Sequence, residues 1–386
     1  MGLLILFLFI PFLAVQLICL FILAVFLLSY VYAYHTRYNL VITRKQDWIA
    51  LYRYQKIDIE FEIENKGFLP LFSLAVVDSA GGLYAGGKER FLITLRAKER
   101  KLVHYEARGY RRGKYLLGPV KVSGMDPLGL FSWEDLHKIM CQVVIYPAIH
   151  TVTLSHLSGL PGGSIVAGNK VYEDVTRFKS LREYTPGDEP RRIHWKASAR
   201  LGSLFSKDFL PTLYYPILLV LNLNTGEYAF RHRYRSAERA IEVAGSLAVA
   251  GIGAGQSVGL LSNGVIDEYD QYTASPFGRT GSHGMVLLEK LACIKPVSNR
   301  EGTVFELVRM NALPFGTRLI YIGPPLDTEC ITFLLTLKRG NTTVELYYLA
   351  WGQRKTDTLI YHNIPVHLVP EYGEISGEKI INSAAV

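Results

Sequence analysis

The N-terminal stretch of this chain, residues 2–34, contains no charged residue, and Gln16 is its only strongly polar side chain. About 20 apolar residues suffice to cross the hydrocarbon core of a bilayer, so the stretch predicts a membrane segment. As a single helix its 33 residues would be about 50 Å long, which exceeds a core of about 30 Å. The helix therefore either tilts and protrudes or folds back near Pro11, and residues 1–34 form a transmembrane segment of one or two passes.

The residues around this segment indicate on which side of the membrane the rest of the chain lies. The N-terminal side offers only the α-amino group, whereas five basic residues follow the segment: Arg37, Arg44, Lys45, Arg53 and Lys56. The positive-inside rule therefore predicts a cell-membrane protein whose soluble domains face the cytoplasm. A cleavable signal peptide is the competing interpretation, because Val31 and Ala33 are small enough for a cleavage site. The missing basic region and the length of the apolar run argue against it.

Composition predicts a folded chain, since 49% of the 386 residues are hydrophobic and 20% are charged. The four cysteines show no paired spacing, which suits a reducing compartment and offers no disulfide framework. Part of the net charge of +8 lies in basic clusters at residues 108–114 and 231–235, where tyrosines are interleaved. Such clusters fit nucleic acid or an anionic membrane surface. The membrane segment favours the membrane surface, so no nucleic-acid partner is expected.

The region after the membrane segment has the pattern of short β-strands. Apolar residues alternate with polar ones over segments such as 57–63, 91–95 and 143–146, and Gly, Pro and Asn separate these segments at short intervals. A period of two indicates strands, and several short strands indicate two packed sheets. We therefore predict a β-sandwich domain over residues 35–150.

Residues 151–214 are predicted to be a linker, rich in Gly, Ser, Thr and Pro at its start, followed by a basic motif region. From residue 215 the pattern changes to apolar strands at 217–221, 258–261, 318–322, 344–349 and around 366, with helices at 235–250, 284–293, 304–310 and 328–338. Strands that are apolar throughout, separated by helices, indicate a parallel sheet covered on both faces. We predict a doubly wound, Rossmann-like α/β domain over residues 215–386, and an α+β multidomain fold for the chain.

Residues 181–200 concentrate a turn, several cations, an imidazole and an indole. The pattern resembles that of a bacterial group, the domain of unknown function 58 family. The likeness is carried by Arg182, Tyr184, Gly187, Asp188, Arg191, Ile193, His194, Trp195, Ala199 and Arg200. Residues 112–119 and 126–131 are similar to the segment that leads into the motif in that family. The resemblance covers the chain from about residue 35 to its end.

The resemblance implies a membrane-tethered protein with a β-sandwich and a von Willebrand factor A-like domain, commonly paired with a MoxR-type AAA+ ATPase. In von Willebrand A domains the end of the first strand usually reads Asp-x-Ser-x-Ser and holds a divalent cation. Here that position carries Asn222, Asn224 and Gly226, and a later strand ends in Gly-Pro-Pro at residues 323–325 where a metal-binding relative would offer an Asp. Because these changes remove the charge that a hard cation favours, we expect no bound metal.

His194, flanked by Asp188 and Trp195, has the chemistry of a general base, since imidazole titrates near neutral pH and a carboxylate can orient it. No Ser or Cys nucleophile is indicated by an elbow-like sequence. We therefore expect a structural role, in which His194 and Trp195 pack the motif against the sheet and Asp188 bonds the turn at Gly187.

Guanidinium and ammonium groups in the motif are able to bind phosphate or carboxylate groups of a partner. The cations concerned are Arg182, Arg191, Arg192, Lys196 and Arg200. The alternative is pairing within the motif, with Glu183, Asp188 or Glu189. We expect a mixture, in which some arginines stabilise the motif and others face a partner.

The sequence contains no P-loop, so any ATPase activity must come from another chain, and no cofactor is expected. We therefore expect a non-enzymatic, membrane-anchored interaction or scaffold protein that docks a cytoplasmic partner, a MoxR-type AAA+ ATPase by the resemblance. One alternative is a cell-envelope-associated hydrolase that uses His194 and Asp188. Another is a metal-dependent adhesion module, which Asn222 disfavours.

Overall fold

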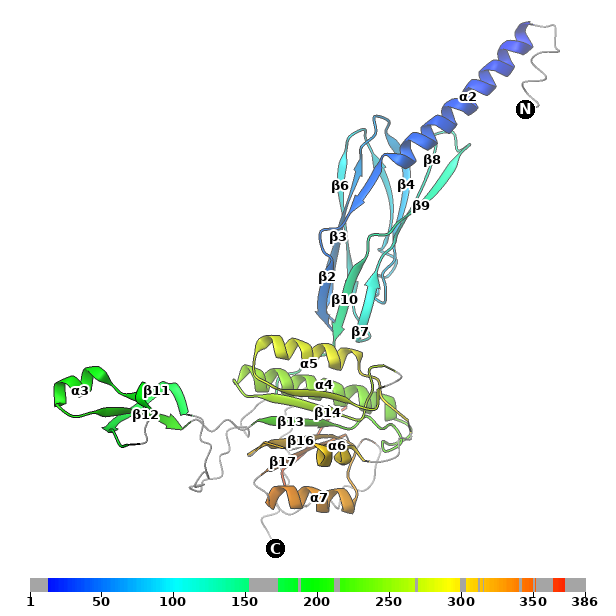
Figure 1. Cartoon of the computed structure of the whole chain (residues 1–386). Helices are drawn as coiled ribbons and strands as arrows, with labels where there is room; N and C mark the ends of the chain where they lie inside the picture. Colours follow the sequence, from blue (N-terminus) through cyan, green and yellow to red (C-terminus); the bar gives the residue numbers. More distant parts are fainter. Residues whose placement is uncertain are drawn as a thin grey trace. The chain divides into compact units, whose positions relative to one another are not determined.

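The computed structural model describes most of the chain, namely residues 13–152, 173–186, 189–211, 216–267, 270–298, 303–311, 313–314, 316–339, 342–349, 351 and 364–371. Its contacts divide the chain into two units. Unit 1 comprises residues 1–149 with Leu288–Ile294, and unit 2 comprises residues 150–287 and 295–386. The fold is mixed α/β, with an N-terminal apolar helix and many strands (Figure 1).

The N-terminal helix α2 (Leu13–Tyr38) is continuous over 26 residues, and the part from Val15 to Tyr38 is long and apolar enough to cross a membrane by length and composition. Its last turn is closed by side chains, because Asn39 Nδ2 donates to the carbonyl of His35 over 2.8 Å. The expected fold-back near Pro11 lies outside the described residues. Within the described part of the chain, α2 is the one helix that meets this criterion of length and composition.

The strands of unit 1 form three sheets, with the orders β1-β3-β6, β2-β10-β7 and β5-β4-β8-β9. Paired neighbours are antiparallel except β2 and β10. The bounds are β1 Leu40–Thr43, β2 Trp48–Tyr52, β3 Lys56–Asn65, β4 Leu71–Asp78, β5 Arg90–Leu95, β6 Arg100–Arg108, β7 Gly113–Leu117, β8 Val120–Met125, β9 Ser132–His137 and β10 Cys141–Tyr146. The strand-rich character expected for this region is present, and the finer assignment to a β-sandwich stays a prediction.

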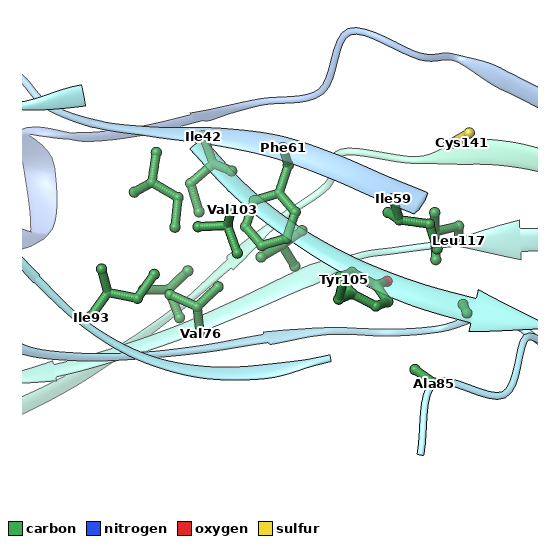
Figure 2. Packing of buried hydrophobic residues seen from close by; sticks show 14 of the residues in the cluster. Ile42, Ile59, Phe61, Val76, Ala85, Ile93, Val103, Tyr105, Leu117 and Cys141 are labelled. Carbon is green, nitrogen blue, oxygen red and sulfur yellow. The ribbon is translucent and has the colours of Figure 1, made fainter. Parts of the chain in front are cut away.

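One hydrophobic core joins the sheets of unit 1, and Figure 2 shows part of it. Alternate residues of β3 point inward, so Ile59, Phe61 and Ile63 are buried. A buried ion pair also lies here, between Arg44 and Asp78, and the hydroxyl of Tyr105 donates to the same Asp78 oxygen over 2.8 Å. The core therefore contains a charge pair whose loss would leave an unpaired buried charge.

Unit 2 contains a six-stranded sheet in the order β15-β14-β13-β16-β17-β18, parallel except for the edge strand β15. Its strands are β13 Ile217–Leu221, β14 Val258–Ser262, β15 Thr273–Gly278, β16 Arg318–Gly323, β17 Thr343–Tyr348 and β18 Val366–Leu368. The helices of this part of the chain are α4 Arg233–Gly253, α5 Gly281–Cys293, α6 Val304–Met310 and α7 Thr328–Arg339, and the residues of α5 from Leu288 onward are assigned to unit 1. The apolar strands and the helices predicted beyond residue 215 are thus present.

Helices cover both faces of this sheet. The side chain of Leu218 packs in a core cluster with residues of α6 and α7. The neighbouring Ile217 points to the other face, where α4 approaches so closely that a Cβ at Gly251 would lie 3.1 Å from the Ile217 side chain. The sheet is therefore buried on both sides, as the continuous apolar strands predict. Its assignment as von Willebrand factor A-like goes beyond this description.

The basic motif region forms a separate two-stranded element within unit 2. Strands β11 (Glu173–Glu183) and β12 (Phe205–Pro211) pair antiparallel, with a short 3-10 helix η2 (Pro190–Arg192) and helix α3 (Trp195–Leu201) between them (Figure 1). We call this element the motif hairpin. The linker predicted at the start of residues 151–214 falls largely on residues outside the described ranges.

Candidate functional site

Backbone hydrogen bonds to the start of β12 hold the insertion between the two strands of the motif hairpin. The amide of Tyr184 donates to the carbonyl of Leu204, and the amide of His194 donates to the carbonyl of Phe205, each over 2.8 Å. Ile193 forms an isolated antiparallel bridge with Ser206. Both ends of the insertion are thereby fixed on the same strand, which positions α3 beside it. Gly187 and Asp188, between these two anchor points, lie outside the described residues.

His194 is the N-cap of α3. Its ring Nδ1 accepts a hydrogen bond from the amide of Ala197 over 3.1 Å, and the same amide also donates to the His194 carbonyl over 3.0 Å. Ser198 connects this cap to the strand, because its hydroxyl donates to the His194 carbonyl and accepts from the Phe205 amide over 2.9 Å. His194 and Ser198 are therefore the groups that maintain the local fold.

The cap also decides what chemistry the imidazole is able to perform. A neutral imidazole has one N–H group and one unprotonated nitrogen. Because Nδ1 of His194 accepts the Ala197 amide, the proton of the neutral ring lies on Nε2. The only basic nitrogen is then engaged in the helix cap, and Nε2 has no lone pair to take a proton from a nucleophile. This geometry argues against a general-base role for His194.

Several other side chains of the motif are exposed to solvent. The indole of Trp195 is 67% exposed, and Lys196 and Arg200 are exposed on the same short helix. The exposure of Trp195 differs from the packing against the sheet that we expected for its ring. Leu201, the last residue of the same helix, is also exposed. Helix α3 thus presents an aromatic and cationic surface.

Several of the motif's arginines make local contacts. Arg191 Nε donates to Glu189 Oε2 over 2.6 Å, Arg192 Nε reaches the same oxygen over 3.4 Å, and Arg182 donates to the Thr185 hydroxyl over 3.1 Å. The hydrogen bond from Arg191 holds the pKa of the Glu189 carboxyl below its usual range. These pairs are exposed, so they contribute little to stability and leave the guanidinium groups accessible to a partner.

A second polar cluster lies at the carboxyl end of β13, around the amide of Asn222. Its Oδ1 accepts from Asn263 Nδ2 over 2.8 Å and from the amide of Asn224 over 3.0 Å. Its Nδ2 donates to Glu227 Oε2 over 2.7 Å and to the Tyr321 hydroxyl over 3.2 Å. The other Glu227 oxygen accepts from Asn224 Nδ2 over 2.9 Å. We call these five residues the amide network.

The amide network occupies the position at which the resemblance would place a cation. Each of its amide and carboxylate oxygens already accepts a hydrogen bond, and the N–H groups that donate these bonds point toward the same oxygens. A hard cation would have to displace these donors. Gly226 contributes only its backbone amide, which donates to Asn224 Oδ1 over 3.2 Å. In the described part of the chain no group of three His, Cys, Asp or Glu residues is placed to hold a metal ion.

The end of β16 completes this arrangement. A Cβ atom at Gly323 would lie 2.6 Å from the Tyr321 hydroxyl and 2.9 Å from the Cβ of Asn222, so an Asp cannot be placed there without moving the tyrosine. The hydroxyl of Tyr321 donates to the carbonyl of Pro324 over 3.0 Å. Burial raises the pKa of Tyr321 well above its usual value, so the phenol stays neutral and contributes no charge to this site.

Asn222, Asn224 and Gly226 are the residues of this site that the sequence pattern indicates, whereas Glu227, Asn263 and Tyr321 become evident only in the structure. Asn263 follows β14 as Asn222 follows β13, and the carboxyl ends of adjacent parallel strands meet at one edge of a sheet. The strand pattern alone therefore predicts that Asn263 lies close to Asn222. The contribution of Tyr321, which comes from within β16, depends on the close approach that Gly323 permits.

Comparison with known proteins gives a family match and one distant relative. The family model described as "Protein of unknown function DUF58" matches residues 180–313. The "Uncharacterized protein YeaD" of Bacillus subtilis (strain 168) is 24% identical over 180 residues, which is 44% of this chain and 44% of that protein. The match thus spans less than half the length of the relative.

The solved structures that resemble parts of the chain do so weakly. They include the ASH/PapD-like domain of human CEP192, at 13% identity and a TM-score of 0.22 over 28% of this chain and 87% of that one. The CARDB domain of the PF1109 protein from Pyrococcus furiosus gives 17% identity and a TM-score of 0.20 over 28% and 90%. Scores this low carry no argument. The comparison that bears on the candidate site is the DUF58 match, which takes in α3 and most of the amide network.

Proposed function

We propose that this chain is a non-enzymatic interaction protein, anchored in the cell membrane by α2, whose motif hairpin docks a cytoplasmic protein partner. By the resemblance of the motif, that partner is a MoxR-type AAA+ ATPase. The observation that carries the proposal is that the side chains of α3 and its N-cap fall into two groups, one hydrogen-bonded within the motif hairpin and one exposed. His194 and Ser198 hold the helix in place, whereas Trp195 and the cations beside it face outward.

An exposed tryptophan beside arginines is the composition expected of an interaction surface. Trp, Tyr and Arg are the residue types most enriched among those that dominate binding free energy at protein interfaces. The indole offers a large apolar area at low entropic cost, and the guanidinium groups pair with carboxylates. Within the described part of the chain, no hydrogen bond or ion pair ties the side chains of Trp195, Lys196 or Arg200 to the local fold, and this favours contact with a partner.

A second exposed surface of the same composition follows β13 and supports the proposal. Between this strand and α4, Phe230 is exposed, and the guanidinium of Arg233 lies 4.7 Å from its ring centroid and 4.8 Å from that of Tyr234. Arg233 is thereby held between two aromatic rings. This surface belongs to the β13–α4 segment that also contains Asn224 and Glu227 of the amide network.

The amide network supports a metal-free, von Willebrand factor A-like sheet rather than a metal-dependent adhesion module. In our proposal the hydrogen bonds of Asn222, Asn224 and Asn263 replace the cation as the element that orders the strand ends. The cap geometry of His194 likewise disfavours the hydrolase alternative.

The docking proposal is tested by cross-linked affinity capture of the full-length protein from native membranes, followed by identification of recovered ATPases. We expect Trp195→Ala and the charge reversals Arg192→Glu and Arg200→Glu to reduce recovery of a MoxR-type ATPase. The matched control is Lys101→Glu, which reverses an exposed charge on β6 of unit 1. Recovery of no ATPase by the native chain, or equal recovery by the motif variants, would contradict the proposal.

The cytoplasmic orientation needs its own test, because docking a cytoplasmic ATPase requires it. Protease added to intact cells should not cut the chain beyond Tyr38, whereas the same protease should cut it after the cells are opened. Cleavage of unit 1 or unit 2 in intact cells would refute this part of the proposal.

A further inference from the structure

The loop between β8 and β9, residues 126–131, is held rigidly against α2 inside unit 1. The carboxylate of Asp126 accepts the amides of Leu128 over 3.0 Å and Phe131 over 2.6 Å, and the amide of Gly129 donates to the Asp126 carbonyl over 3.0 Å. The Phe131 ring then packs on the helix. We call residues 126–131 the helix-side loop.

The contacts of Phe131 place the helix-side loop along α2. Its ring centroid lies 6.2 Å from that of Phe26 and 5.8 Å from that of Tyr30, both in edge-on geometry. At a rise of about 1.5 Å per residue, these two residues lie about 18 Å and 12 Å along the helix from Tyr38. The loop therefore reaches well up the apolar helix, beyond the strands to which it belongs.

The tip of this loop exposes apolar side chains that its own fold does not use. Leu128 is 62% exposed and Leu130 is 44% exposed, although the Asp126 hydrogen bonds fix the turn between them. Loop tips in contact with water normally carry polar residues. A rigid turn that presents two leucines beside an apolar helix has the composition of a surface that meets lipid.

The length of the span agrees with this assignment. About 20 helical residues cross a bilayer core, and the part of α2 that is long and apolar enough to do so extends from Val15 to Tyr38. A span drawn within the described helix therefore includes Phe26 and Tyr30, the residues against which the loop packs. Tyr30, Tyr34 and Tyr38 follow one another along the helix, as aromatic residues do at a membrane interface.

Exposed basic residues occur on the neighbouring turns, closer to the end of α2. The amide of Lys66 donates to the carbonyl of Asn39 over 2.8 Å, and the amide of Lys98 donates to the carbonyl of Gly67 over 3.2 Å. Lys66, Lys98 and Arg96 are exposed, and so is Phe68, whose ring lies 4.2 Å from that of His35. In unit 1, the exposed leucines thus lie beside the middle of α2, and the exposed cations lie near its C-terminal end. This order matches a bilayer, in which acyl chains lie deeper than the headgroup phosphates.

We propose that Leu128 and Leu130 insert into the headgroup–acyl boundary of the phospholipid bilayer that α2 crosses, with Lys66, Arg96 and Lys98 at the level of the lipid phosphates. This inference rests on the membrane anchoring in the proposed function. Its consequence is that unit 1 is tied to the membrane at two points, the helix and the helix-side loop, instead of swinging on the helix alone.

The test uses the full-length protein in phosphatidylcholine vesicles whose acyl chains carry bromine, which quenches tryptophan on contact. Leu128→Trp is compared with Leu116→Trp. Leu116 is 49% exposed and belongs to β7, a strand drawn at the end of unit 1 away from α2 (Figure 1). The four native tryptophans are accounted for by subtracting the unsubstituted protein. We expect the tryptophan at position 128 to lose most of its emission and the one at position 116 to keep it.

Flotation of the vesicles separates the possible failures. If the protein floats and the tryptophan at position 128 emits as strongly in brominated as in ordinary lipid, the loop does not enter the bilayer and the inference is refuted while anchoring stands. If the protein does not float with the vesicles, the proposed anchoring and the inference both fail. Circular dichroism of each variant shows whether the substitution leaves the strands intact.

Discussion

Replacing His194 tests whether the imidazole is a helix cap. In His194→Ala the amide of Ala197 loses the acceptor that Nδ1 supplies at 3.1 Å and keeps only the backbone carbonyl of residue 194 at 3.0 Å. Loss of an N-cap costs about 1 kcal/mol, within a range of about 0.5–2 kcal/mol. In His194→Asn the side-chain oxygen restores an acceptor of the type preferred at this position, so most of that free energy should return.

The effect is local, so the assay must report on α3 alone. Hydrogen–deuterium exchange of the full-length protein, read by mass spectrometry on a peptide that contains Trp195–Leu201, measures how often this helix opens. A loss of about 1 kcal/mol corresponds to about fivefold faster exchange in His194→Ala. We expect His194→Asn to exchange at nearly the native rate. A peptide from β13 should be unchanged in both variants.

The same pair of variants separates the structural role from a catalytic one. An asparagine is able to cap a helix but is not able to act as a general base, so the structural role predicts normal partner capture by His194→Asn. If His194→Asn exchanges as fast as His194→Ala, the cap is not what the imidazole contributes. If instead a hydrolytic turnover of the native protein is abolished in His194→Asn while α3 stays protected, the non-enzymatic proposal is wrong.

Three further predictions follow from buried groups. The amide network predicts no Mg²⁺ or Mn²⁺ binding at micromolar affinity in calorimetry of the native protein, and binding that disappears on changing Asn222 would contradict this. Burial raises the pKa of the Cys330 thiol to about 12, so at pH 8 only about one thiol in ten thousand is a thiolate. Rapid alkylation of Cys330 in the folded chain by iodoacetamide would refute this. Arg44→Met should destabilise unit 1 by about 3–5 kcal/mol in urea unfolding, because it leaves Asp78 unpaired in the core. Burial already raises the pKa of Asp78, and removal of Arg44 raises it further, so the deficit should shrink as the pH is lowered and Asp78 takes up a proton; a deficit independent of pH would contradict this.

The strands of the parallel sheet were predictable because burial on both faces leaves a direct mark on the sequence. Residues 217–221 and 318–322 are apolar or neutral almost throughout, and they form β13 and β16. The helices between them were found for a related reason, since each must cover one face of the sheet. Segments of this kind are determined by local composition, and tertiary contacts change only their ends.

Strands that are stabilised mainly by pairing with a neighbouring strand do not show a continuous apolar run in the sequence. The edge strand β15 contains Pro276 and shows little alternation, which an edge position tolerates because one side of the strand needs no partner. Strands β11 and β12 of the motif hairpin are rich in charged residues, and their register is set by one another. The sequence therefore predicted a linker followed by a basic motif region over residues 151–214, but not the two strands that the motif region contains.

The candidate sites show the same limit more sharply. The sequence indicated that His194, Trp195 and the arginines belong together, but it predicted that Trp195 packs inward with His194, because proximity along the chain does not reveal the direction of a side chain. The structure separates them by hydrogen bonding and exposure. Likewise the replacement of acidic ligands at Asn222 was visible, whereas the hydroxyl of Tyr321 beside Gly323 was not, because that contact joins strands far apart in the chain.

Because the structure separates exposed from hydrogen-bonded residues on α3, the docking proposal predicts different effects for substitutions in the two groups. We call Trp195, Lys196 and Arg200 the outward set, and His194 and Ser198 the inward set. If binding depends on the outward set, Trp195→Ala and Arg200→Glu should reduce partner capture without changing hydrogen exchange of α3. If the inward set only maintains the helix, Ser198→Ala should speed that exchange, because the amide of Phe205 loses its acceptor, and should reduce capture only as far as α3 opens. A variant of the outward set that speeds exchange as much as Ser198→Ala would show that the two sets are one structural unit. The exposed surface of α3 would then give no evidence of a partner.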